Sequence, residues 1–122
     1  MEILAIALQV IVSLGLLNVW ILRFNCKTSY RGGEATSMRE EFAAYGLPAS
    51  VMLAVGGLKI LSALALLAGI WLPVAVIPAA SVIALLMIAA IAMHMKVKDP
   101  LVKFLPAAGV LVMTIGILVL NA

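Results

Sequence analysis

The chain has 122 residues, of which 66% are hydrophobic and 11% charged, and its mean hydropathy is +1.30. Soluble domains are about 45–50% apolar and about 25% charged, and a chain this short cannot bury so much apolar surface in its own core. The composition excludes a water-soluble enzyme and a disordered chain, and a net charge of +3 is too small for nucleic-acid binding. We therefore expect one integral membrane domain, residues 1–122, with the lipid bilayer as its partner.

Apolar stretches long enough to cross a bilayer recur along the chain, since a spanning helix needs about 20 mainly apolar residues. We expect helices at about 3–22, 47–70, 74–96 and 100–120. The last three are separated by short connections, which make them antiparallel neighbours. The predicted fold class is all-α: an integral membrane four-helix antiparallel bundle.

The first connection, residues 23–46, is the one sizeable polar stretch. Ser37 and Glu40 have the spacing of a capping box, with Ser at the N-cap and Glu at the third helical position. An apolar stripe follows at helical spacing: Met38, Phe42 and Tyr45. We expect a short helix at 38–45 that lies on the membrane surface.

The last two predicted helices contain prolines that affect where and how each helix begins. Asp99 is predicted as the N-cap of the fourth helix, with Pro100 at its first position. Pro78 and Pro106 fall inside the third and fourth helices, where each removes a backbone donor. We expect a kink or a delayed helix start at each.

The basic residues predict the orientation. Seven of the eight lie in or beside the first and third connections: Arg23, Lys27, Arg31, Arg39, Lys96, Lys98 and Lys103. With four spanning helices these connections share one side, which the positive-inside rule makes cytoplasmic. We expect loops 23–46 and 96–100 to be cytoplasmic, both termini to be outside, and the membrane to be a bacterial plasma membrane.

The eighth basic residue, Lys59, falls near the middle of the second helix. A charge there costs roughly 2.5–3.5 kcal/mol, so we expect it to face the bundle interior. Its long side chain reaches toward the cytoplasmic half. The candidate partners on that half are Asn18, His94, Glu40 and Glu41.

Two interpretations of Lys59 stay open. Its ammonium lines a ligand cavity and binds an anion or the carbonyl of a lipophilic molecule, or it pairs with Glu40 or Glu41 and fixes the surface helix. His94 is the single histidine, either a hydrogen-bonding residue or a proton-transfer or ligand contact. Trp20 is either an interfacial anchor or a cavity residue.

No catalytic set emerges, and one His with one Cys is too few for a metal site. We assign no catalytic or metal residues and expect no catalytic activity of the chain on its own.

An ordered set of short motifs resembles the DoxX-like family of small four-helix membrane proteins over nearly the whole chain. The motifs are Asn18-Val19-Trp20, Tyr30–Gly33, Glu41–Pro48, Val55–Lys59, Leu67–Pro73 and Ala92–Pro100. The resemblance implies kinship with the small membrane subunit of a thiosulfate:quinone oxidoreductase, with subunits of oxidative-stress complexes, and with an animal receptor-assembly chaperone. Many relatives carry an acidic residue where this chain has Lys59, so the role of that acid is not transferred.

We expect a protein that binds a lipophilic small molecule of the quinone or isoprenoid type in a polar-lined intramembrane pocket, as a possible subunit of a redox complex. The expected ligand-binding residues are Lys59, Asn18, His94, Glu40, Glu41 and Trp20. Two alternatives remain: an assembly, chaperone or scaffold subunit for another membrane protein, and an oligomeric small-solute carrier. Quinone is the one cofactor suggested, and the partner is a membrane protein or a second copy of the chain.

Overall fold

The computed structural model describes residues 3–25 and 30–122, and this part of the chain is helical without strands. The helices in chain order are α1 (Ile3–Leu17), a π-helical turn η1 (Asn18–Leu22), α2 (Met38–Ala44), α3 (Ala49–Ala68), a 3-10 turn η2 (Pro73–Ala75), α4 (Val76–Lys96) and α5 (Leu101–Asn121). The predicted fold class is therefore confirmed.

Four segments of the described chain are long and apolar enough to cross a membrane: Ile3–Leu22, Ala49–Ala68, Pro73–Lys96 and Leu101–Asn121. Each begins and ends within about two residues of a predicted span. The short helix expected at 38–45 is present as α2, at Met38–Ala44. The chain is thus a multi-pass membrane protein.

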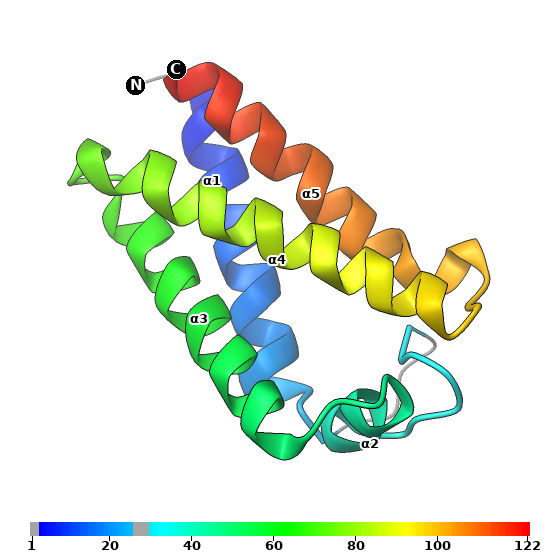
Figure 1. Cartoon of the computed structure of the whole chain (residues 1–122). Helices are drawn as coiled ribbons and strands as arrows, with labels where there is room; N and C mark the ends of the chain where they lie inside the picture. Colours follow the sequence, from blue (N-terminus) through cyan, green and yellow to red (C-terminus); the bar gives the residue numbers. More distant parts are fainter. Residues whose placement is uncertain (1–2, 26–29) are drawn as a thin grey trace.

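The four long helices pack as a ring in which α1 and α4 each lie between α3 and α5. The start of α1 and the end of α5 lie together at one end of the molecule (Figure 1). Toward the other end α1 and α5 move apart, and α2 lies there beside the start of α3 (Figure 1). The bundle is consequently closed at one end and splayed at the other.

Two apolar clusters hold these elements. The larger one fills the closed end with Val12 and Leu16 of α1, Leu66 of α3, Ile83 of α4 and Ile117 of α5, among others. The smaller one joins η1, α2 and α3 through a group of mostly large side chains: Trp20, Met38, Phe42 and Met52. Because this second cluster buries the apolar stripe of α2, it fixes the short helix across the splayed end.

A capping box has two hydrogen bonds between the N-cap residue and the third helical residue, and the start of α2 forms one of them. The Ser37 hydroxyl accepts a hydrogen bond from the Glu40 backbone N–H at 3.2 Å, as predicted. The Glu40 carboxylate, however, accepts from the backbone and the hydroxyl of Thr36, one residue earlier than a capping box requires. Gly46, with φ of +79°, ends the helix in the left-handed region that favours glycine.

The prediction that Asp99 caps α5 was wrong. Pro100 occupies the N-cap and the helix begins at Leu101. The Asp99 carboxylate instead forms hydrogen bonds with the ring of His94 and the backbone N–H of Gly33. Pro78 falls in the first turn of α4, whose start is delayed to Val76 by η2, as expected. Pro106 lies inside α5, which already begins at Leu101, so the start of that helix is not delayed.

Candidate ligand cavity

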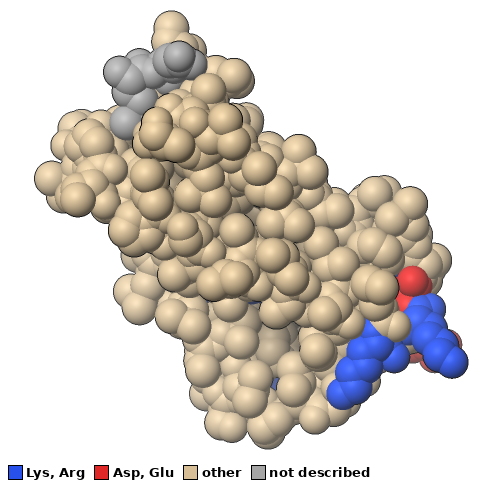
Figure 2. Space-filling view, turned by 45° about the horizontal axis from the view of Figure 1, so that its top comes forward, with Lys and Arg blue, Asp and Glu red and all other residues tan. Residues whose placement is uncertain are grey.

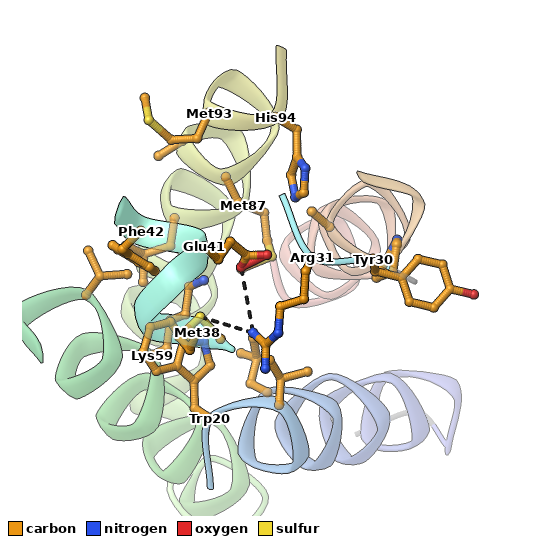
Figure 3. A pocket seen from close by; sticks show the side chains of 18 of the residues that line it. Trp20, Tyr30, Arg31, Met38, Glu41, Phe42, Lys59, Met87, Met93 and His94 are labelled. Atoms are coloured by element: carbon orange, nitrogen blue, oxygen red, sulfur yellow. Dashed lines mark hydrogen bonds and ion pairs between the residues drawn. The ribbon is translucent and has the colours of Figure 1, made fainter. Parts of the chain in front are cut away.

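A cavity of about 720 Å³ lies in the splayed end of the bundle. Its wall is built by the end of α1 with η1, by α2, and by the halves of α3, α4 and α5 that lie toward the splayed end. The volume lies within the range of about 300–1,000 Å³ that is typical of small-molecule sites. Most of the lining is apolar, and a few polar side chains point into it (Figure 3).

The structure brings most of the predicted site residues to this one cavity. Those that line it are Asn18, Trp20, Glu41, Lys59 and His94. Glu40 is not part of the lining, since it is exposed on α2 and its carboxylate is bonded to Thr36. The two adjacent glutamates of α2 therefore have different surroundings.

Lys59 meets an aromatic face in the cavity wall. Its Nζ atom lies 5.0 Å from the ring centroid of Trp20, a distance at which the cation is attracted to the ring face. The indole is held in turn by Phe24 and Phe42, each with a ring centroid 5.9 Å away. The ring packs this closely on α3 because Gly56 has no side chain: a Cβ atom there would lie 2.5 Å from the indole.

None of the ion pairs between described residues includes Lys59. The pairing of Lys59 with Glu40 or Glu41, one of the two interpretations of the sequence, is thus not formed, and the ammonium remains at the cavity. Figure 3 places Lys59 beside Trp20, Met38 and Glu41 on one side of the cavity.

Glu41 is the centre of a buried polar group that ties the first connection to α2. Its Oε1 atom accepts a hydrogen bond from the Gly32 backbone N–H at 2.8 Å, and its Oε2 atom lies 3.7 Å from Nη1 of Arg31. Arg31 also donates to the backbone oxygens of Arg23 and Phe24, the latter at 3.1 Å. A buried charge needs such partners, because it costs several kcal/mol when unpaired.

A second polar group runs from α2 to the α4–α5 turn. The Tyr45 hydroxyl lies 3.3 Å from Nε2 of His94, and Nδ1 of His94 lies 2.7 Å from Asp99. We assign the Nδ1–H tautomer because a carboxylate accepts at that nitrogen, which lets Nε2 accept from the Tyr45 hydroxyl. Burial, together with the nearby Glu41 carboxylate, raises the pKa of Tyr45, so the hydroxyl keeps its proton.

Asp99 also connects this group to the first connection and to α5. It accepts from the Gly33 backbone N–H at 3.0 Å and lies 3.9 Å from Nζ of Lys103, which donates to the Gly33 carbonyl. On the same side, Lys96 donates to the Tyr45 carbonyl at 2.8 Å. The segment that covers the splayed end is therefore held by apolar packing on α3 and by polar bonds on α4 and α5.

The sequence reasoning missed several members of these groups. From the sequence, Arg31 and Lys103 have the role of topology signals, Asp99 that of a helix cap, and Tyr45 a place in the apolar stripe of the short helix. Asp99 and Gly33 are separated by 66 residues, and no local pattern links them. Within the described residues, no three His, Cys, Asp or Glu side chains come close enough to hold a metal ion.

These features define the class: a small helical membrane protein with four spanning helices, whose splayed end holds a mostly apolar cavity with buried charges. The model of the DoxX-like family matches residues 27–117, which includes α2, α3, α4 and most of α5. The chain belongs to the DoxX-like family. No curated protein and no solved structure matched the chain.

Proposed function

We propose that the chain binds one lipophilic small molecule, of the quinone or isoprenoid type, in the cavity of its splayed end. The observation that carries the proposal is Lys59: an ammonium inside a spanning helix that faces an apolar cavity and has no ion-pair partner among the described residues. Placing such a charge in a membrane span costs roughly 2.5–3.5 kcal/mol, and charged residues at this depth generally serve a ligand or an ion.

The rest of the wall suits the body of such a molecule. Side chains of α3, α4 and α5 supply an apolar lining: Val51, Val55, Leu86, Ala90 and Val110 among them. Sites for lipophilic molecules combine a predominantly apolar wall with a few polar groups that fix the orientation. Tyr45, His94 and Lys59 are polar groups of this kind. A quinone-type ligand would suit a subunit of a membrane redox complex, the setting that the sequence resemblance implies.

The test is ligand-dependent thermal stability of the purified protein in a neutral detergent. We expect a short-chain quinone or an isoprenoid alcohol to raise the unfolding temperature, because ligand at 100 times its Kd adds about 2.7 kcal/mol to stability. Ala90→Phe fills part of the cavity and is expected to abolish the shift. Leu85→Phe, on an exposed position of α4, is the matched control that retains it.

Two results would contradict the proposal: a wild-type protein that responds to none of these compounds, or an Ala90→Phe variant that responds like wild type. A stoichiometric partner protein that copurifies in mild detergent, without any small molecule, would instead favour the assembly or scaffold function. A small-solute carrier would require an oligomer, because four helices enclose little space.

We also propose that the splayed end faces the cytoplasm of a bacterial cell, with both termini outside. Lys and Arg gather mainly at one end of the molecule in Figure 2, and this distribution supports the orientation. In a Cys26→Ser background, Glu34→Cys is expected to react with a membrane-impermeant maleimide only after the cells are permeabilised. Trp71→Cys, in the exposed turn after α3, is expected to react in intact cells. The reverse labelling pattern would overturn the orientation.

A further inference from the structure

We infer that the polar end of the ligand is an acidic group, a carboxylate or a phosphate, which pairs with Lys59. This inference rests on the proposed function and specifies the class of ligand. Within the lipophilic ligands of the proposed function it favours those with an acidic head group, such as an isoprenoid or other long-chain acid or a monoalkyl phosphate, and it makes neutral quinones and alcohols weaker ligands of the same cavity.

The charges of the cavity wall are unbalanced. The lining contains four cationic side chains, Arg23, Arg31, Lys59 and Lys103, against one carboxylate, Glu41. Two of these cations have carboxylate neighbours: Arg31 lies 3.7 Å from Glu41, and Lys103 lies 3.9 Å from Asp99, just outside the lining. The wall as a whole therefore carries an excess of positive charge toward any occupant.

The carboxylate of Glu41 is already engaged and does not neutralise Lys59 through an ion pair. One of its oxygens accepts from Gly32 at 2.8 Å, and the other lies next to Arg31. Both contacts hold Glu41 on the side of the first connection. An ion pair between Lys59 and a carboxylate is absent among the described residues.

The aromatic partner of Lys59 supplies no countercharge, and Glu41, which acts on the ammonium electrostatically, forms no ion pair with it. Trp20 offers a ring face at 5.0 Å, which attracts a cation but carries no negative charge. A lysine ammonium has three N–H donors, and its hydrogen bonds are charge-assisted with any acceptor, so the two kinds of head group differ in the charge that they bring. A neutral carbonyl would accept one hydrogen bond and leave the charge in place, whereas an acidic head group would neutralise it.

The chain offers its own reporter for the experiment. It contains two tryptophans, Trp20 beside Lys59 and the exposed Trp71, so Trp71→Phe leaves a single tryptophan, at the proposed head-group site, that can be excited selectively at wavelengths where tyrosine does not absorb. We would titrate this variant, in neutral phosphatidylcholine nanodiscs, with palmitic acid, hexadecyl phosphate, hexadecanol, hexadecylamine and a decyl-substituted benzoquinone. Empty nanodiscs correct for partitioning into the lipid.

We expect the acid, the phosphate or both to bind at least about tenfold more tightly than the alcohol, the amine and the quinone. The comparison of the two acids identifies which head group the site prefers. Lys59→Met is expected to abolish the preference for acids while alcohol binding remains. Lys98→Met, which removes an exposed charge outside the cavity lining, is the matched control and is expected to leave the preference unchanged.

The outcomes separate this inference from the proposed function. Equal binding of the acid, the alcohol and the quinone would overturn the acidic head group and leave a lipophilic site standing. Binding of none of the compounds would overturn both. A Lys59→Met variant that keeps the full preference for acids would also overturn the inference. Should Lys59→Met fail to fold, Lys59→Gln, which keeps a polar side chain without the charge, is expected to lose the preference for acids, and a preference that persists in this variant would overturn the inference.

Discussion

Gly56 and Gly57 are neighbours on α3, and we predict opposite effects of the same substitution at the two positions. A Cβ atom at Gly56 would lie 2.5 Å from Cζ3 and 2.7 Å from Cε3 of Trp20. These distances are shorter than real contacts, so the indole must move away from the packing with Phe24 and Phe42. Overpacking of this kind costs about 1–3 kcal/mol, against a gain of about 0.8–1.0 kcal/mol in helix propensity. We expect Gly56→Ala to destabilise the protein by about 0–2 kcal/mol.

Gly57→Ala is the matched control, because nothing lies within 4 Å of a Cβ atom at that position. Only the gain in helix propensity remains there, about 0.8–1.0 kcal/mol. The two variants should therefore differ by about 1–3 kcal/mol in the free energy of unfolding. The assay is unfolding by sodium dodecyl sulfate from mild-detergent micelles, followed by Trp20 fluorescence in the Trp71→Phe background. Equal stability of the two variants, or a less stable Gly57→Ala, would refute the assigned packing of Trp20 on α3.

The remaining predictions concern the polar groups of the splayed end. Because burial and Glu41 raise the pKa of Tyr45, the folded chain keeps a proton that the unfolded chain releases above the ordinary value of 10.0. Stability should therefore fall as the pH rises above 10, by up to about 1.4 kcal/mol per pH unit, and Tyr45→Phe should flatten this fall in a thermal-unfolding series. Asp99→Ala leaves the donors of Gly33 and His94 without acceptors, at about 1–3 kcal/mol each, so we expect a loss of about 2–6 kcal/mol in detergent unfolding. Glu40→Gln should change stability by less than about 0.5 kcal/mol, and a similar value for Asp99→Ala would contradict the assigned role of Asp99.

The membrane architecture was predictable because it depends on local properties of the sequence. The length of an apolar stretch determines whether it can cross a bilayer, and the predicted spans agree with the helices that the structure contains. The expectation that Lys59 faces the interior came from the cost of exposing a charge to lipid, and the structure places it at the cavity. Neither prediction needed knowledge of distant contacts.

The difference between the two glutamates of α2 was within reach of the sequence. Glu41 lies three residues after Met38 and four before Tyr45, so it shares the apolar face of the helix, whereas Glu40 does not. The structure follows this pattern, with Glu41 buried and Glu40 exposed. The apolar stripe of α2 thus already distinguishes the buried glutamate from the exposed one.

The role of Asp99 could not be predicted from its neighbours. An aspartate before a proline at a helix start is typical of an N-cap, and a local pattern gives no reason to expect otherwise. In the structure the carboxylate has buried donors from two other segments, His94 of α4 and the Gly33 backbone, and these tertiary bonds outweigh the local capping preference. The same holds for Arg31, whose partners depend on how the first connection folds back on α2.

The most direct test of the central claim is where in the cavity a long-chain acid places its head group. Two palmitic acids, one brominated next to the carboxylate and one at the far end of the chain, can be compared as quenchers of Trp20 in the Trp71→Phe variant. Because Trp20 lies against Lys59, the account predicts stronger quenching by bromine next to the carboxylate. Equal quenching, or stronger quenching by bromine at the far end of the chain, would contradict it.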